Sequence, residues 1–367
     1  MAVGVVCGLA IAAFAFGAVI SDRGGGPPPS PASQLPLPRL VGLRLIAGFQ
    51  GTSVPGPMRR AIHRGDLAGV ILFDENLSSR AAARALIAEV EAIRRPSGLR
   101  DPLLVMIDQE GGQVKRLTGA PTVSAARMGA AGAVSSRSQG RATAANLHGV
   151  GVNVDLAPVL DVARPGGTIA SAERGFGSSA TAVEETAVSF AAGLQELGVA
   201  ATAKHFPGLG AAAENTDFAV QRIDLSKRTL RAVDERPYRR FAEAGGELVM
   251  LSTAIYPAFS PRPAAFARSI ATGELRRRIG FHGVSITDAL ESAAVRDFGG
   301  PAAAARAAAA AGTDLLLFTD YPAALAGGRA LLGRLRSAPG ARGAFETSAG
   351  RILRLRRALA TNAARRR

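Results

Sequence analysis

The sequence has 367 residues, 44 Lys and Arg against 29 Asp and Glu, and a formal net charge of +15. Apolar residues make up 47% of the chain, which is enough to bury the core of one large α/β domain. The single cysteine, Cys7, excludes a disulfide framework and a cysteine-rich zinc site, and the lack of Trp argues against a nucleic-acid-binding protein that stacks bases on aromatic side chains.

Arginine carries nearly all of the positive charge, because Lys115, Lys204 and Lys227 are the only lysines. Two interpretations of this bias stay open. An arginine-rich chain with abundant Ala and Gly is typical of a GC-rich genome. A positive surface also attracts anionic polymers, such as a cell wall or a membrane surface.

The N-terminal residues 2–20 are apolar and carry no charge. This length is just enough for a helix that crosses a bilayer, and it is long for the apolar part of a signal peptide. No basic residue precedes the stretch, and the residues before Cys7 match a lipoprotein cleavage site poorly. We expect residues 1–22 to form a hydrophobic helix that anchors the protein in a membrane, with a cleaved signal peptide as the alternative.

Residues 23–39 are rich in Gly, Pro and Ser, a composition typical of a semi-rigid linker. The remaining residues, 40–363, are expected to form one globular catalytic domain. An anchor, a linker and a globular domain together predict an extracytoplasmic protein that is held near the membrane or secreted.

Short apolar runs alternate with helical patterns through the globular part. The helical stretches show apolar residues at helical spacing, for example over 78–95 and 181–197. Seven runs are predicted to be strands, at 68–73, 102–108, 151–162, 198–206, 247–253, 283–289 and 313–319. No glycine-rich dinucleotide-binding motif follows the first run, so repeated βα units favour a (β/α)8 TIM-like barrel with one strand still to be found.

Polar residues follow most of these runs, and in this barrel catalytic residues lie at the carboxyl ends of strands. Single polar residues at such places are usually caps or turns, but several at equivalent positions predict a site. They are Asp74, Glu75 and Asn76 after the first run, Asp108, Glu110, Lys115 and Arg116 after the second, Asp155, Asp161, Glu173 and Arg174 around the third, Lys204 and His205 at the fourth, and Asp288 after the sixth.

Five motifs resemble those of glycoside hydrolase family 3. They read IDQEGGQVKRL from residue 107, VDLAPVLDV from 154, RGFG from 174, KHFPGLG from 204 and SITDAL from 285. The chain is most similar to the single-barrel β-N-acetylglucosaminidases of that family, and the likeness covers nearly the whole globular part. Nothing in the chain resembles the second domain of the family's larger members.

The resemblance implies a retaining mechanism in which Asp288 is the nucleophile that forms a covalent glycosyl-enzyme. A helix N-cap is the structural alternative for Asp288. The resemblance further implies sugar contacts for Asp108, Arg116, Arg174, Lys204 and His205. Two side chains and water suffice for this reaction, so no metal or organic cofactor is expected, and the histidines show no metal-ligand spacing.

The chain departs from the family at the proton shuttle, an Asp-x-His pair on the loop after KHFPGHG. Here Asn215 stands in place of the aspartate and Asp217 in place of the histidine, and Leu209 replaces the histidine within the motif. Three interpretations stay open: Asp217 is the acid/base, Glu214 takes that role, or the protein is a weakly active or non-catalytic glycan-binding pseudoenzyme.

The sequence therefore predicts an extracytoplasmic β-N-acetylhexosaminidase-like glycosidase. Its expected partners are a carbohydrate substrate, with peptidoglycan fragments as a candidate, and a membrane through the N-terminal segment.

Overall fold

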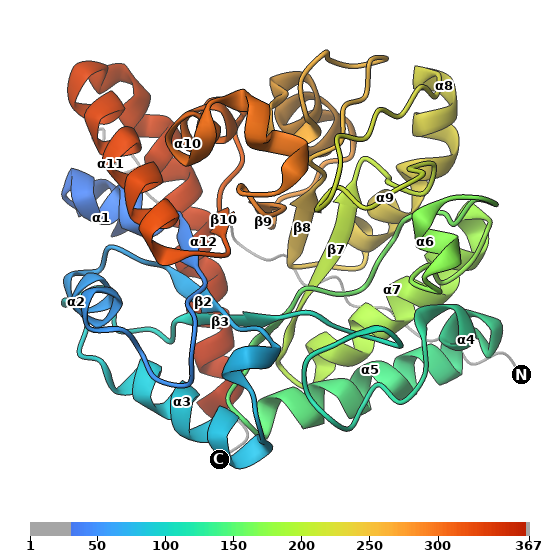
Figure 1. Ribbon diagram of the computed structural model, residues 1–367, viewed down its shortest axis with the longest axis horizontal. Coiled ribbons are helices and arrows are strands. Elements are labelled where there is room, and N and C mark those ends of the chain that lie inside the picture. Colours follow the sequence, from blue (N-terminus) through green and yellow to red (C-terminus); the bar gives the residue numbers. More distant parts are fainter. Residues whose placement is uncertain (1–30, 365–367) are drawn as a thin grey trace, which may run out of the picture.

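The computed structural model describes residues 31–364 (Figure 1). Its central feature is one parallel sheet of eight strands: β1 (Leu45–Ala47), β2 (Gly69–Ile71), β3 (Leu104–Ile107), β6 (Val154–Asp155), β7 (Ala200–Phe206), β8 (Leu248–Leu251), β9 (Val284–Thr287) and β10 (Leu316–Phe318). The strand order is β10-β1-β2-β3-β6-β7-β8-β9, and a parallel bridge between Ile286 and Leu315 joins the two ends. The sheet is therefore a nearly closed, TIM-like barrel, as predicted.

Helices connect the strands and surround them (Figure 1). The longer ones are α2 (Gly56–Arg64), α3 (Arg80–Ala92), α5 (Gly132–His148), α7 (Ala180–Glu196), α9 (Arg236–Glu243), α10 (Gly300–Ala311) and α11 (Tyr321–Ser337). Shorter elements are α4 (Ala125–Ala130), α6 (Thr168–Ser171), α8 (Lys227–Thr229), the π-helical segments η3 (Leu230–Asp234) and η5 (Ser269–Arg278), and the hairpin β4 (Gln109–Gly111) with β5 (Val114–Lys115).

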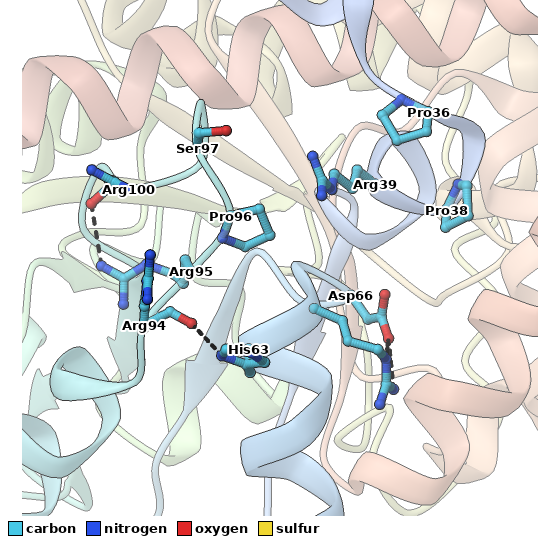
Figure 2. A pocket seen from close by; sticks show the side chains of 11 residues that line it. Pro36, Pro38, Arg39, His63, Asp66, Arg94, Arg95, Pro96, Ser97 and Arg100 are labelled. Carbon is cyan, nitrogen blue, oxygen red and sulfur yellow. Dashed lines mark hydrogen bonds and ion pairs between the residues drawn. The ribbon is translucent and has the colours of Figure 1, made fainter.

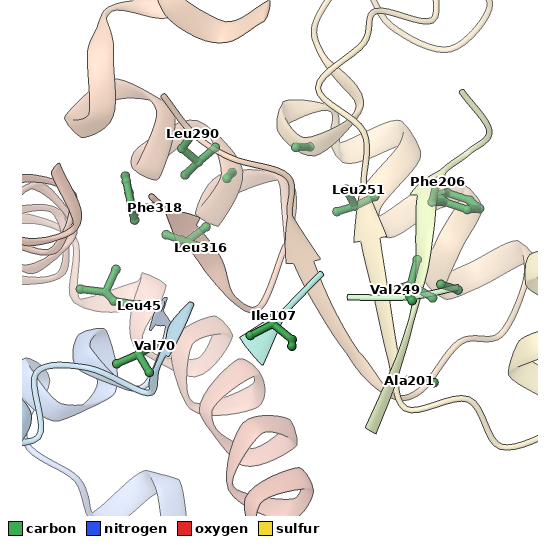
Figure 3. Packing of buried hydrophobic residues seen from close by; sticks show 14 of the residues in the cluster. Leu45, Val70, Ile107, Ala201, Phe206, Val249, Leu251, Leu290, Leu316 and Phe318 are labelled. Carbon is green, nitrogen blue, oxygen red and sulfur yellow. The ribbon is translucent and has the colours of Figure 1, made fainter. Parts of the chain in front are cut away.

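Alternate residues of each strand face two different cores, as the period of two in a strand requires. One set points outward and packs under the helices; Figure 3 shows Leu45, Val70, Ile107, Val249 and Leu316 among them. The other set fills the barrel interior and includes Ile46, Ile71, Leu104, Met106, Val154, Leu248, Ile286 and Leu317. The barrel centre is therefore packed with side chains and is not a pore.

Helix α12 (Arg342–Ala364) closes the end of the barrel at which the strands begin. Its residues Ile352, Leu355 and Leu359 belong to the same apolar cluster as the barrel interior. The buried Arg356 fixes the helix by donating to the carbonyl oxygens of Pro102 at 2.8 Å and Leu99 at 3.0 Å, just before β3. The opposite end, where the strands finish, is left for a site.

All seven predicted strands are present in the barrel, and β1 is the eighth. The predicted strands did not include β1, because Arg44 directly precedes it and breaks the apolar run. That arginine is buried, and its Nε donates to the carbonyl oxygen of Asp314 at 3.0 Å. Arg44 therefore interrupts the apolar pattern of the sequence, but in the folded chain it links the start of β1 to the start of β10.

The described part of the chain begins within the predicted linker. Residues Pro31–Gln34 form the 3-10 helix η1, and α1 (Leu37–Gly42) follows. Ala32 and Leu35 are buried in a cluster with Ala349 and Leu353 of α12. Packed structure therefore starts before residue 40, the predicted beginning of the globular domain.

The predicted N-terminal hydrophobic helix, residues 1–22, lies outside the described residues. Within residues 31–364, no helix is both long enough and apolar enough to cross a membrane.

Candidate active site

A cavity of about 290 Å³ lies where the barrel strands end. It is lined by all seven residues to which sequence analysis gave a catalytic or sugar-binding role: Asp108, Arg116, Arg174, Lys204, His205, Asp217 and Asp288. Glu110 and Asn215 line it as well. Side chains that are up to 180 residues apart in the sequence (108 to 288) therefore meet around one space, although their roles stay predictions.

Four charged side chains form a connected network in the wall of this cavity. Lys204 Nζ lies 2.7 Å from Asp108 Oδ1 and 2.7 Å from Glu110 Oε1. Arg174 binds Glu110 through two parallel bonds of 2.8 Å, from Nε to Oε2 and from Nη2 to Oε1. Such paired bonds fix the guanidinium plane, so Glu110 orients both cations of this network.

The network keeps Glu110 and Lys204 charged although both are buried. Burial alone would raise the pKa of Glu110, but Arg174 and Lys204 together hold it well below its usual range. Burial would lower the pKa of Lys204, but Asp108 and Glu110 raise it above its ordinary value. Lys204 and Arg174 are therefore permanent hydrogen-bond donors, which suits the binding of sugar hydroxyl oxygens.

Glu110 was predicted only as a polar residue that follows a strand, with no role of its own. The signal was its place in DQEGG, and only the folded chain shows both of its cationic partners. We expect Glu110→Gln to lower the free energy of unfolding by about 3–5 kcal/mol, because a buried ion pair loses its anion. Chemical denaturation measures this loss.

The matched control is Glu89→Gln, whose partner Arg59 is 47% exposed. Removing a surface ion pair of this kind costs about 0–1 kcal/mol. Equal losses in the two variants would show that the Glu110 network does not stabilise the fold.

The hairpin that carries Arg116 is organised by Gln109. The Gln109 Nε2 donates to the carbonyl oxygen of Leu117 at 2.8 Å, and its Oε1 accepts from the backbone N–H of Arg116 at 3.0 Å. Arg116 then reaches back over the cavity, with Nη1 at 3.2 Å from Asp74 Oδ2 and Nη2 at 3.8 Å from Asp108 Oδ2. A buried amide thus places the guanidinium at the cavity edge.

His205 is held by a second residue without an assigned role, Asp161. The Nδ1 of His205 lies 2.7 Å from Asp161 Oδ2, and Asp161 Oδ1 accepts from the backbone N–H groups of His205 at 3.1 Å and Leu209 at 2.7 Å. With Nδ1 engaged, the other ring nitrogen of His205 is the one left for the cavity. Asp161 is therefore a positioning residue for His205. From its place in VDLAPVLDV, the sequence indicated only that it is polar and follows a strand.

Asp288 directly follows β9 and lies at the cavity. Its Oδ1 accepts from the backbone N–H of Ala289 at 2.8 Å. The next helical segment, η6 (Ala293–Phe298), has Ser292 at its N-cap, so Asp288 is not a helix cap. Burial raises the pKa of Asp288, and the opposing effect of nearby His205 and Lys204 favours its ionised form.

The loop after β7 brings Asp217 to the same cavity. Asn215 Oδ1 accepts from the backbone N–H of Asp217, and Asn215 Nδ2 donates to Asp217 Oδ2, both at 3.0 Å. The Asn215 side chain thus holds the Asp217 carboxylate in one orientation through its Oδ2. The other oxygen of that carboxylate, Asp217 Oδ1, is left for other contacts. Glu214 is exposed and is absent from the residues that line the cavity.

A larger cavity, of about 600 Å³, lies at the end of the barrel where the strands begin (Figure 2). Its walls carry Arg39, Arg64, Arg94, Arg95 and Arg100, and none of the predicted site residues. Size therefore does not identify the active site of this chain. Within residues 31–364, no group of three or more His, Cys, Asp or Glu side chains could hold a metal ion.

The chain is similar to glycoside hydrolases over most of its length. A protein of Arthroderma benhamiae named an uncharacterized secreted glycosyl hydrolase is 37% identical, over 78% of this chain and 83% of its own length. A protein of Alkalilimnicola ehrlichii named beta-hexosaminidase is 35% identical, over 77% of this chain and 82% of its own.

Among solved structures, a glycoside hydrolase family 3 beta-N-acetylglucosaminidase from Paenibacillus sp. str. FPU-7 is 33% identical, with a TM-score of 0.83. The similarity covers 89% of this chain and 63% of that protein, so this chain spans somewhat less than two thirds of its length. The pattern of the glycosyl hydrolase family 3 N terminal domain matches residues 44–355. The chain therefore belongs to glycosyl hydrolase family 3.

Proposed function

We propose that this glycoside hydrolase is a retaining β-N-acetylhexosaminidase, with Asp288 as its nucleophile and Asp217 as its general acid and base. The observation that carries the proposal is the meeting of these two carboxylates in one cavity. The backbone N–H groups of Ala293 and Ala294 donate to the carbonyl oxygens of Asp217 and Thr216, each at 3.2 Å. These bonds tie the loop of Asp217 to the loop that follows Asp288.

The chemistry that this pair would perform has two steps. First, an Asp288 oxygen attacks the anomeric carbon while Asp217 gives its proton to the departing glycosidic oxygen. Second, Asp217 takes a proton from water, and the water oxygen displaces Asp288 from the anomeric carbon. Lys204, Arg174, Asp108, Arg116 and His205 would hold the sugar hydroxyls, since they supply donors and acceptors around the ring.

The substrate and the location are part of the proposal. N-acetylhexosamine specificity is supported by the relatives named beta-hexosaminidase and beta-N-acetylglucosaminidase. Action outside the cytoplasm is supported by the relative named a secreted glycosyl hydrolase and by the apolar residues 2–20. Cell-wall fragments that contain N-acetylhexosamine are the natural substrates we expect.

The test is to follow the hydrolysis of N,N′-diacetylchitobiose by proton NMR. The proposal predicts that the β-anomer of N-acetylglucosamine from the non-reducing end appears first, because two displacements at one carbon retain configuration. An α-anomer as the first product would contradict the two-step mechanism. A protein that binds the disaccharide but does not hydrolyse it would be the glycan-binding pseudoenzyme.

A further inference from the structure

Exposed large apolar side chains are rare in the described part of the chain. Within residues 31–364 they are Val134, at 87% exposure, Phe218, at 80%, and Val220, at 46%. Two of the three lie within three residues of Asp217, on the loop that borders the cavity. Phe218 therefore exposes an aromatic ring to water directly beside the proposed acid/base Asp217 in the chain.

The size of the cavity indicates where a second sugar would lie. Its volume of about 290 Å³ is at the lower limit of small-molecule sites, which span about 300–1,000 Å³. Asp108, Glu110, Arg174 and Lys204 form one charged wall of this space, and its volume suits a single sugar ring. The ring on the other side of the glycosidic bond must therefore lie outside, against the rim.

Phe218 directly follows Asp217 in the chain, and its exposed side chain is not among those that line the cavity. A general acid contacts the glycosidic oxygen, so the residues next to it lie beside the departing ring. The loop is held in place there: the backbone N–H of Phe218 donates to the carbonyl oxygen of Asn215 at 3.1 Å, and Ala293 donates to Asp217 at 3.2 Å. These bonds hold the backbone of Phe218 next to Asp217.

We infer that Phe218 forms the platform of a leaving-group subsite, on which the apolar face of the departing pyranose ring stacks. This inference rests on the proposed function of Asp217. The axial C–H groups of a β-linked pyranose form an apolar face, and aromatic rings bind such faces through burial and weak C–H contacts. The subsite selects substrates whose leaving group is a ring, and it contributes nothing when the leaving group is a single atom.

The experiment compares two substrates in the full chain: N,N′-diacetylchitobiose, whose leaving group is a sugar, and N-acetyl-β-glucosaminyl fluoride, whose leaving group is fluoride. For Phe218→Ala we expect kcat/KM to fall about 10-fold on the disaccharide and to change less than about twofold on the fluoride. Phe218→Tyr, which keeps the ring, should retain the wild-type ratio between the substrates. The melting temperature of Phe218→Ala should be unchanged, because the side chain is exposed.

The matched control is Val134→Ala, an exposed apolar residue on α5, which should leave both substrates unaffected. Equal loss on both substrates in Phe218→Ala would overturn the subsite, because the ring would then act on the loop or on Asp217. No loss on the disaccharide would overturn it as well. A wild type that is inactive on both substrates would instead refute the proposed function.

Discussion

Replacing Asp288 with alanine is expected to lower kcat/KM by at least about 10⁴-fold on both a disaccharide and an aryl N-acetyl-β-glucosaminide. No other group can form the glycosyl-enzyme in the proposed mechanism, so a better leaving group does not compensate. Asp288 is half-buried at the cavity, and His205 and Lys204 lie close enough to influence its pKa. Initial rates on both substrates measure the loss.

The pH dependence of the wild type follows from the same residue. Only ionised Asp288 attacks, and burial raises its pKa above the ordinary value of 3.8. The rate should therefore fall as the pH is lowered through a pKa higher than 3.8.

The matched control for Asp288→Ala is Asp224→Ala, since Asp224 is an exposed carboxylate paired with Arg222. Activity of Asp288→Ala within tenfold of Asp224→Ala would remove Asp288 from the mechanism.

Replacing Asp217 with alanine is expected to lower kcat/KM on the disaccharide by about 10²–10⁴-fold, the usual contribution of a general acid. An aryl substrate with a low-pKa phenol should lose far less, because such a leaving group departs without a proton. Added azide should restore turnover of the aryl substrate, since it attacks the glycosyl-enzyme without help from a base. Steady-state rates with both substrates, with and without azide, measure these effects.

Glu214→Gln separates Asp217 from its neighbour on the same loop. Glu214 is exposed and lies outside the cavity lining, so its variant should hydrolyse both substrates at the wild-type rate. If Glu214→Gln rather than Asp217→Ala showed the leaving-group dependence, the acid/base would be Glu214. If neither variant did, the loop would supply no proton.

The barrel could be predicted because its strands are short apolar runs separated by clear helices. The exception, β1, pairs with β10, and Leu45 lies opposite Leu316, a partner that no local pattern reveals. Its neighbour Arg44 looked like a break in the apolar run, yet it is buried and bonded to the backbone before β10. Tertiary contacts thus override the local signal at that strand.

The site could be predicted as a set of residues but not as a network. Strand ends and motifs identified Lys204 and Arg174, whereas the ion pairs that join both to Glu110 depend on the packing of β7, the β4–β5 hairpin and the loop after α6. Likewise, Asp161 was visible as a polar position, but its bond to the His205 ring appears only after folding. The side-chain clamp between Asn215 and Asp217 was equally hidden, because spacing alone does not fix a side-chain direction.

The most direct measurement of the central claim is to trap the glycosyl-enzyme. The Asp217→Ala variant is mixed with 2,4-dinitrophenyl N-acetyl-β-glucosaminide, which needs no acid to react but leaves an intermediate that lacks its base for hydrolysis. Mass spectrometry of the digested protein should then find an N-acetylglucosaminyl group on the peptide that contains Asp288. Release of dinitrophenol without an adduct, or an adduct on a different residue, would contradict the account.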